Sequence, residues 1–404
     1  MSETSTPLYL WDDGRARRFE PFSLTRPAGE LRAGAEIVRR RWERAAGTDA
    51  TGFVAGEHLE SFEEGGAPPW AASVPAGALL VNSRVVPALD ARVPEDASRL
   101  TCAGRLAAVR LAWPATGEQL AAVERLEDLP AADGAEVPLA GRWIDEVWEL
   151  VATLEAQLAE DVPALAAELL VAPPEGAIVI GEHPVHVEAG ARVEPMVCFD
   201  VTAGPVLVRS GATIAAFSRV VGPAVLGERS AVLGGSVAVS SIGERCKVSG
   251  EVSHIVMLGH ANKAHDGFVG YSYLGRWVNL GASTVTSNLK NTYGPVSVWT
   301  PAGLRNTGMQ FLGTLFGDHV KTGIATVCNT GSVMGAGANV YGGAMLPKVV
   351  PPFAWGDGEP FETYDLERFL QVAERVMRRR EVELGERGRM QLAAAHRARW
   401  SAGA

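Results

Sequence analysis

A six-residue periodicity of small apolar side chains dominates the chain between residues 176 and 352. One run places Val208, Ile214, Val220, Leu226, Val232 and Ala238 at successive intervals of six, and a second places Phe316, Thr322, Cys328, Met334, Val340 and Leu346 in the same way. A period of six fits neither a helix nor a hairpin strand, and it is a signature of β-helices. We therefore expect a β-helix over residues 176–352, with roughly nine or ten three-sided coils and these side chains pointing inward. A glycine-rich β-sandwich with accidental spacing is the alternative.

The first 170 residues alternate between strand and helix patterns instead. Strands are expected over residues 8–12, 77–87 and 105–114, and helices over 28–44 and 141–170, with Pro163 breaking or kinking the second helix. This alternation predicts a small α/β domain over residues 1–170. Paired prolines make a stiff junction to the β-helix, and a single helix over residues 362–400 is expected to end the chain.

Composition limits the class of protein. Of the 404 residues, 47% are hydrophobic and 21% charged, which fits a globular protein of two domains. A net charge of -10 argues against a general nucleic-acid binder, which needs a basic face. The polar start "MSETSTP" lacks the features of a signal peptide, and no apolar stretch predicts a membrane span, so we expect a cytoplasmic protein. Four cysteines without a C-x-x-C pair predict reduced, buried thiols rather than a disulfide or metal site.

Polar side chains gather between residues 260 and 290 of this otherwise aliphatic repeat. They are His260, Lys263, His265, Asp266, Asn279, Asn288 and Lys290. Between residues 254 and 274 the six-residue frame is interrupted, which predicts a loop, and loops commonly carry function. With 18 residues per coil, His265 is expected one coil below Ser283. An imidazole of ordinary pKa, about 6.5, can take a proton from an attacking amine, although a purely structural role for His265 stays open.

The segment 265–288 resembles the acetyltransferase half of the bifunctional N-acetylglucosamine-1-phosphate uridylyltransferase/glucosamine-1-phosphate acetyltransferase. His265, Asn279 and Asn288 match that family's histidine and two asparagines without a gap. Through segments such as 24–34 and 329–343, the whole chain is similar to shorter, divergent two-domain proteins described as sugar nucleotidyltransferases.

The resemblance implies a left-handed parallel β-helix that acetylates an amino-sugar phosphate, with acetyl-CoA as co-substrate. It implies that His265 is the general base, that Asn279 and Asn288 orient sugar and phosphate, and that the Ala282 amide, next to Gly281, faces acetyl-CoA. It also implies a homotrimer with each site between subunits.

One departure from the family concerns the phosphate. The family's lysine twelve residues before the histidine is Ser253 here, so Lys263 and Lys290, with Lys247, are the candidate phosphate ligands.

For residues 1–170 the resemblance implies a Rossmann-like nucleotidyltransferase domain that would use a nucleoside triphosphate with Mg²⁺. The family's glycine-rich phosphate loop is absent. The corresponding stretch keeps Gly14, Arg15 and Arg26, and with Asn82 these are the candidate nucleotide-binding residues.

Two other functions remain open. His260-x4-His265 has a spacing like that of the γ-class carbonic anhydrases, which bind zinc between subunits, but no third histidine lies between His186 and His254. The β-helix could instead be a non-catalytic scaffold or regulator that binds sugar nucleotides.

Overall fold

The chain divides into two compact units in its structure, a computed structural model that describes residues 6–167, 169 and 174–400. The described residues of the first unit are 6–19, 23–147 and 385–398, and the second contains those of 20–22, 148–384 and 399–400. This partition differs from the expected limits of 1–170, 176–352 and 362–400 in its placement of residues 148–165 and 385–398.

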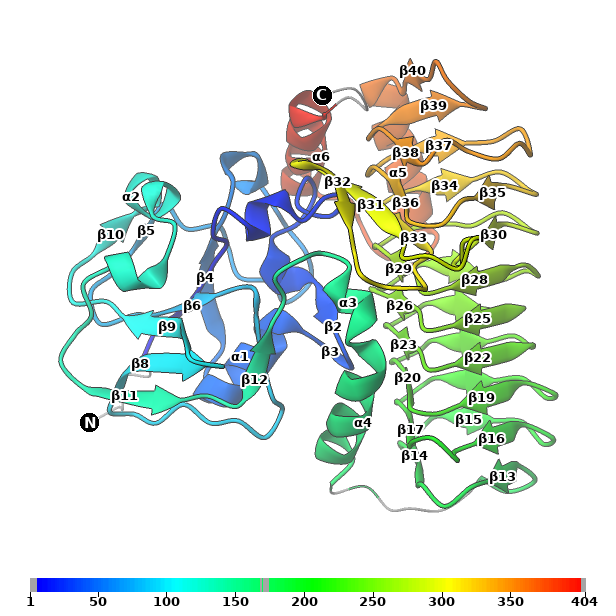
Figure 1. Cartoon of the computed structure of the whole chain (residues 1–404), viewed down its shortest axis with the longest axis horizontal. Helices are drawn as coiled ribbons and strands as arrows, with labels where there is room; N and C mark the ends of the chain where they lie inside the picture. Colours follow the sequence, from blue (N-terminus) through cyan, green and yellow to red (C-terminus); the bar gives the residue numbers. More distant parts are fainter. Residues whose placement is uncertain (1–5, 168, 170–173, 401–404) are drawn as a thin grey trace. The chain divides into compact units, whose positions relative to one another are not determined.

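A mixed sheet in the order β11-β8-β9-β6-β1-β4 forms the centre of the first unit (Figure 1). Its strands are β1 (Leu8–Trp11), β4 (Ala50–Val54), β6 (Leu79–Asn82), β8 (Ala97–Cys102), β9 (Arg105–Arg110) and β11 (Ala135–Pro138). Strand β1 is parallel to both β4 and β6, whereas β9 is antiparallel to β6 and β8. The carboxyl ends of β1, β4 and β6 therefore meet at one edge, which is where open α/β sheets commonly bind ligands.

Short strand pairs and helices complete the first unit. The pairs are β2 (Arg32–Ala33) with β3 (Glu36–Ile37), β5 (Ser73–Val74) with β10 (Ala115–Thr116), and β7 (Val85–Pro87) with β12 (Gly141–Trp143); the helices are α1 (Val38–Ala46), α2 (Gly117–Ala122) and α6 (Glu386–Ala398). The prediction of a helix over residues 28–44 is wrong for the residues before Val38, where α1 begins. Residues 28–37 form a turn and the β2–β3 hairpin, in which Gly34 adopts a φ of 60° that favours glycine.

The second unit is a parallel β-solenoid with three walls, and Figure 1 shows its strands stacked coil upon coil. The first wall contains β14 (Val185–Val187), β17 (Val206–Val208), β20 (Ala224–Leu226), β23 (Ser241–Ile242), β26 (Val256–Met257), β29 (Tyr273–Leu274), β33 (Thr314–Phe316), β36 (Ser332–Met334) and β38 (Val349–Val350). The second contains β15 (Arg192–Val193), β18 (Thr213–Ile214), β21 (Ala231–Val232), β24 (Lys247–Val248), β27 (Asn262–Lys263), β34 (Lys321–Thr322), β37 (Asn339–Val340) and β39 (Ala354–Gly356). The third contains β13 (Ile178–Ile180), β16 (Cys198–Asp200), β19 (Arg219–Val221), β22 (Ser236–Ala238), β25 (Glu251–Ser253), β28 (Phe268–Gly270), β30 (Val285–Thr286) and β35 (Val327–Cys328). The nine described strands of the first wall confirm the expected β-helix.

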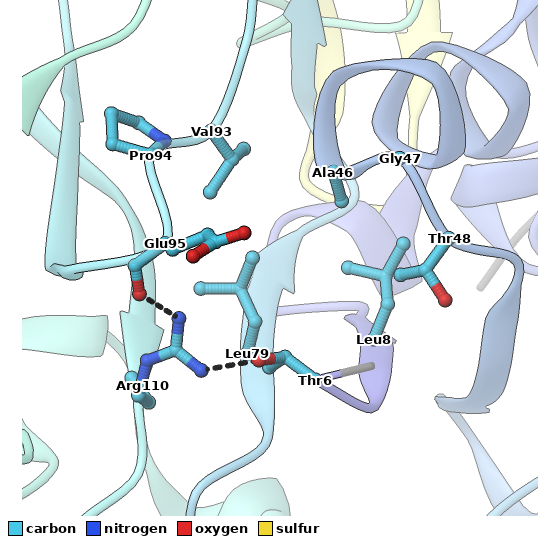
Figure 2. Close-up of a pocket in the computed structure, with 10 residues that line it drawn as sticks. All are labelled: Thr6, Leu8, Ala46, Gly47, Thr48, Leu79, Val93, Pro94, Glu95 and Arg110. Carbon is cyan, nitrogen blue, oxygen red and sulfur yellow. Dashed lines mark hydrogen bonds between the residues drawn. The ribbon is translucent and has the colours of Figure 1, made fainter. Parts of the chain in front are cut away.

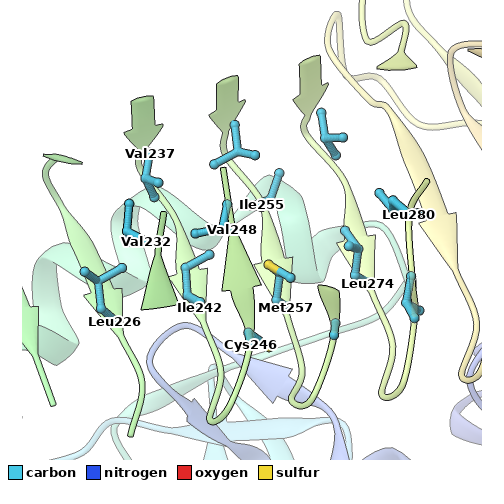
Figure 3. Close-up of a cluster of buried hydrophobic side chains, with 14 of the residues drawn as sticks. Leu226, Val232, Val237, Ile242, Cys246, Val248, Ile255, Met257, Leu274 and Leu280 are labelled. Atoms are coloured by element: carbon cyan, nitrogen blue, oxygen red, sulfur yellow. The ribbon is translucent and has the colours of Figure 1, made fainter. Parts of the chain in front are cut away.

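The interior of the solenoid holds the side chains that repeat every six residues. Figure 3 shows part of this core, in which Leu226, Ile242, Met257 and Leu274 follow one another in successive coils of the first wall, and Val232 and Val248 do so in the second. The predicted inward positions are buried except Ala238, which is half-buried, whereas its neighbour Val237 is buried. The shift arises because the corner before β22 has three residues, 233–235, where the corner before β19 has four, 215–218. Among the four free cysteines, Cys198 is half-buried and the others are buried.

The structure corrects three further expectations. The helix expected over 141–170 is instead β12, α3 (Glu149–Ala152) and α4 (Leu154–Leu165), and α4 packs on β20 and contains Pro163. The single helix expected over 362–400 is instead α5 (Leu366–Arg378) and α6, because Glu381, at a φ of 60°, interrupts it. The loop expected over 254–274 is a regular coil. The chain leaves the solenoid later, between β30 and β33, in a hairpin of β31 (Ser297–Thr300) and β32 (Gly303–Asn306).

The chain ends its solenoid with an added strand, β40 (Glu362–Thr363), which pairs antiparallel with β39. In the described part of the chain, no helix has the length and apolar character needed to cross a membrane.

Candidate functional site

His265 lies at the corner of the solenoid between the second and third walls, in the four-residue connection 264–267 from β27 to β28. The Ser283 N–H of the next coil donates to the Asp266 carbonyl at 2.9 Å, so His265 lies one coil below Ser283 as expected. The His265 side chain is exposed, and its ring makes no hydrogen bond to any residue that the structure describes. The ring is therefore available to a ligand.

Asn279 and Asn288 also keep polar side-chain atoms that have no hydrogen-bond partner among the described residues. Asn279 bridges β27 and β34 in the second wall, and its Oδ1 accepts from Asn262 Nδ2 at 2.9 Å, while no described residue accepts from its own Nδ2. Asn288 follows β30 and is half-buried. A Cβ atom on Gly270 would lie 2.8 Å from Asn288 Nδ2 and 2.4 Å from Cζ of Phe268, so the amide of Asn288 lies beside the Phe268 ring.

Lys263 and Lys290, the candidate phosphate ligands, already have partners. Lys263 is 2% exposed and occupies an inward position, and its ammonium donates to the carbonyls of Ser249, at 3.0 Å, and of His265. Lys290 Nζ donates to the Pro295 carbonyl at 2.5 Å. The expected direct contact of Lys263 with a phosphate therefore disagrees with its burial.

Gly281 and Ala282 differ in the availability of their amides. The Gly281 N–H donates to the Thr322 side chain at 3.0 Å and to its carbonyl at 3.1 Å, so this amide joins neighbouring coils. The Ala282 carbonyl accepts from Ala325 N–H at 2.8 Å, and its own N–H makes no hydrogen bond to the residues described. Of these two amides, the one expected to face acetyl-CoA, that of Ala282, is thus the one without a hydrogen-bond partner among the described residues.

His260 lies at a different corner, between the first and second walls, where it packs in a column of aromatic rings. Its ring centroid is 4.3 Å from that of Trp277, and its Nδ1 is 2.9 Å from Arg276 Nη1. Burial, together with the charges of Arg245 and Arg380, lowers the pKa of His260 to about 4. The five-residue separation of His260 and His265 spans a whole wall of the coil, so it separates the two rings instead of bringing them to one zinc ion.

The first unit holds a second polar cluster, at the carboxyl ends of β1 and β6. Asp13 follows β1, and its buried carboxylate accepts from Arg84 Nη2 at 2.7 Å and from Asn82 Nδ2 at 2.9 Å. Burial acts to raise the pKa of Asp13, but the hydrogen bonds and charge of Arg84 outweigh it, so the pKa is lowered. The Arg15 and Ala16 N–H groups also donate to Asp13, at 3.0 and 2.8 Å, which holds the loop at Gly14 against the strand end.

Asp145 joins this cluster from the chain after β12. Its carboxylate contacts Arg84 Nη1 at 2.6 Å, Arg105 Nη1 at 2.9 Å and Arg15 Nη1 at 3.2 Å. Arg105 also stacks on Trp143, with its guanidinium carbon 3.8 Å from the ring centroid. The side chains of Arg15 and Arg105 are 49% and 42% exposed, so their guanidinium groups can reach a ligand, whereas Arg84 is buried.

The predicted nucleotide-binding residues therefore lie in two separate places. Gly14, Arg15 and Asn82 meet around Asp13, while Arg26 is buried elsewhere, with its Nη1 2.7 Å from Glu64 Oε2. The sequence prediction missed Arg84, Arg105, Asp13 and Asp145. The sequence "NSR" directly after an apolar strand was the signal that could have indicated Arg84, since polar residues at such strand ends meet at one edge of the sheet.

A hollow of about 560 Å³ lies at the opposite end of the same strands (Figure 2). It is lined by the first residues of β1 and β6, Leu8 and Leu79, and by Arg110. The guanidinium of Arg110 donates to Thr6 Oγ1 at 2.8 Å and to the Glu95 carbonyl at 3.2 Å, so its charged group already binds the walls of the hollow.

Comparisons with known proteins agree with the resemblance found in the sequence. Residues 8–169 match the family model described as sugar nucleotidyl transferase, which confirms this resemblance for the first part of the chain. Over 112 residues the chain is 33% identical to a bifunctional sugar-1-phosphate nucleotidylyltransferase/acetyltransferase from Sulfurisphaera tokodaii. This match covers 28% of the chain and 27% of that relative, so the chain spans about a quarter of the relative's length.

A crystal structure from Bacillus cereus, described as an acetyltransferase, also matches, with 13% sequence identity and a TM-score of 0.28. The match covers 52% of this chain and 98% of that one, and a similarity this low supports no conclusion about the chain. The matches to the family model and to the relative from Sulfurisphaera tokodaii identify the chain as similar to sugar-nucleotide transferases.

Proposed function

We propose that the β-solenoid transfers the acetyl group of acetyl-CoA to the amine of an amino-sugar phosphate, with His265 as the general base. The observation that carries this proposal is that the His265 ring, Asn279 Nδ2 and the Asn288 side-chain amide have no hydrogen-bond partner among the residues that the structure describes. The curated relative's acetyltransferase name, together with the sequence resemblance at these residues, supports the same reaction.

In the proposed step the amine nitrogen attacks the thioester carbonyl carbon, forming the N–C bond, and the C–S bond then breaks. His265 takes the proton from the attacking nitrogen, and this proton passes to the departing thiolate of CoA. The open N–H of Ala282 would donate to the carbonyl oxygen as negative charge develops on it. Asn279 and Asn288 would hold the hydroxyl and phosphate groups of the acceptor on either side of the His265 corner.

The test is acetyl-CoA consumption by the full chain with a panel of amino-sugar phosphates. His265→Ala should lower turnover by about 10²–10⁴-fold, the usual contribution of a general base, with the thermal midpoint unchanged because the ring is exposed. His183→Ala is the matched control, since His183 is an exposed histidine at the start of the same solenoid. Equal turnover in the wild type and His265→Ala would reject the general-base role, and ligand binding without any turnover would favour the scaffold or regulator.

A second function, binding of a nucleotide or sugar phosphate by the first unit, is favoured by the exposed guanidinium groups of Arg15 and Arg105. A phosphate group would compete with Asp145 for these two arginines. Mg²⁺ is usually held by one or two carboxylates together with waters and phosphate oxygens. The carboxylates of Asp13 and Asp145 already bind arginines, so these residues do not fit a resident Mg²⁺. Positive charge at this edge of the sheet comes from the arginines instead.

Calorimetry with nucleoside triphosphates and sugar 1-phosphates, with and without Mg²⁺, tests this second function. Arg105→Met should weaken binding, while Arg125→Met, which changes an arginine exposed elsewhere on the first unit, should not. Absence of binding by every ligand in the panel would leave the first unit without the proposed role.

A further inference from the structure

A lysine occupies an interior position of the solenoid where every aligned residue in the coils below it is aliphatic. In the second wall, Lys263 is in register with Val248, which is in register with Val232, and the column continues with Ile214 and Val193. Lys263 is 2% exposed. A buried ammonium is unfavourable unless its hydrogen bonds are satisfied, so this position calls for a physical reason.

The reason lies in the lengths of the corners between the second and third walls. The corner that follows β24 has two residues, 249–250. The corner that follows β27 contains His265 and has four residues, 264–267. The His265 corner therefore extends beyond the corner beneath it. Among the residues described, no backbone N–H donates to the carbonyl of His265.

The Lys263 ammonium supplies a donor to that carbonyl. It donates to the carbonyl of Ser249, in the short corner, and to the carbonyl of His265, in the long one. Gly250 makes room for this arrangement, because a Cβ there would lie 3.2 Å from Lys263 Nζ and 3.1 Å from the His265 carbonyl oxygen. The same lysine thus ties the overhanging corner to the rigid coil below.

We infer that Lys263 is a positioning residue, which holds the backbone of the overhanging corner so that the His265 ring projects in one orientation. The inference rests on the proposed function for the role of His265 in acetyl transfer, but the contact that orients the corner is independent of it. Burial lowers the pKa of Lys263 to about 8, and Asp266, the charged group that acts on this ammonium, partly opposes the shift. A buried ammonium lowers stability, and such a residue is expected where the orientation of a functional group matters more than the stability of the fold.

The first experiment compares Lys263→Met with the wild type. Methionine fills the same space without the donor, so the thermal midpoint should be equal or higher, because a buried charge is removed. The turnover number should fall by about tenfold to a hundredfold with little change in KM for acetyl-CoA, since small misplacements of a catalytic group cost rates of this order. Val232→Ala, in the same interior column two coils lower, is the control and should lower the thermal midpoint without changing turnover.

A second measurement does not depend on activity. In protein with isotope-labelled histidine, the NMR signals of the His265 ring should shift and broaden in Lys263→Met, while those of His183 stay as in the wild type. Lys263→Gln, which keeps a shorter donor, should restore part of the wild-type spectrum and turnover, and it serves as the test variant if Lys263→Met fails to fold.

The two outcomes that count against the proposals are distinct. Unchanged His265 signals in Lys263→Met, or wild-type turnover in a variant that folds, would overturn the positioning role. Absence of acetyl transfer by the wild type, with the spectral change still present, would reject the proposed function and leave the positioning role standing.

Discussion

Removal of Arg84 should destabilise the first unit more than removal of an exposed arginine does. Its side chain is 6% exposed and lies between two aspartates, with Nη2 2.7 Å from Asp13 and Nη1 2.6 Å from Asp145. Asp13 is itself 4% exposed, so Arg84→Met would leave a buried carboxylate with the Asn82 amide and two backbone N–H groups as its partners. Breaking a buried ion pair in this way costs about 3–5 kcal/mol.

The loss should depend on pH in a defined direction. In the wild type the pKa of Asp13 is lowered, so this carboxylate contributes stability that is present above its ordinary pKa and is lost as the pH falls through the folded-state value. Without Arg84, burial dominates and raises the pKa of Asp13. The difference in free energy of unfolding between wild type and variant should therefore be largest near neutral pH and shrink in acid.

Urea unfolding with hydrogen exchange of the peptides that contain β1 and β6 assigns the transition to the first unit. Arg125→Met is the control, because Arg125 and Asp128 form an exposed pair at 3.9 Å, and such pairs contribute about 0–1 kcal/mol. In the Arg84→Met background, Asp13→Asn should recover much of the loss, since it removes the uncompensated charge. A loss below about 1 kcal/mol for Arg84→Met, or no recovery in the double variant, would refute this account of the cluster.

Three further results are expected. Burial raises the pKa of Asp12 to about 6, so the charged carboxylate is disfavoured in the folded state and stability falls as the pH rises through that value. Asp12→Asn should therefore raise the thermal midpoint at pH 7.5, with no gain below about pH 4. Gly235→Ala, at a φ of 84° and with its Cβ 2.1 Å from the Gly250 carbonyl oxygen, should destabilise the solenoid by about 2–5 kcal/mol, whereas Gly294→Ala meets only a contact at 3.8 Å and should be nearly neutral in thermal melts. Light scattering should give a homotrimer, three times 42.7 kDa, and a monomer at micromolar concentration would contradict that prediction.

The sequence alone predicted the β-helix and most of its inward-pointing side chains, because the position of each inward side chain depends only on its spacing from its neighbours along the chain. Val220, Leu226 and Met334 could be placed without knowledge of distant residues, since a chain that turns every six residues buries one side chain per wall. Where a corner changed length, this reasoning failed: Val237 instead of Ala238 is buried, and an expected loop proved to be a regular coil.

The candidate sites required the tertiary structure because their partners are far apart in the sequence. Asp13 and Arg84 are 71 residues apart, and Arg84 and Asp145 are 61 apart, so no local pattern relates them. The sequence indicated His265, Asn279 and Asn288 by their spacing, and it indicated Lys263 as a candidate phosphate ligand instead of an interior residue. Only the stacking of a four-residue corner on a two-residue corner shows why that ammonium lies inside the coil, since corner lengths acquire a physical meaning when one coil rests on another.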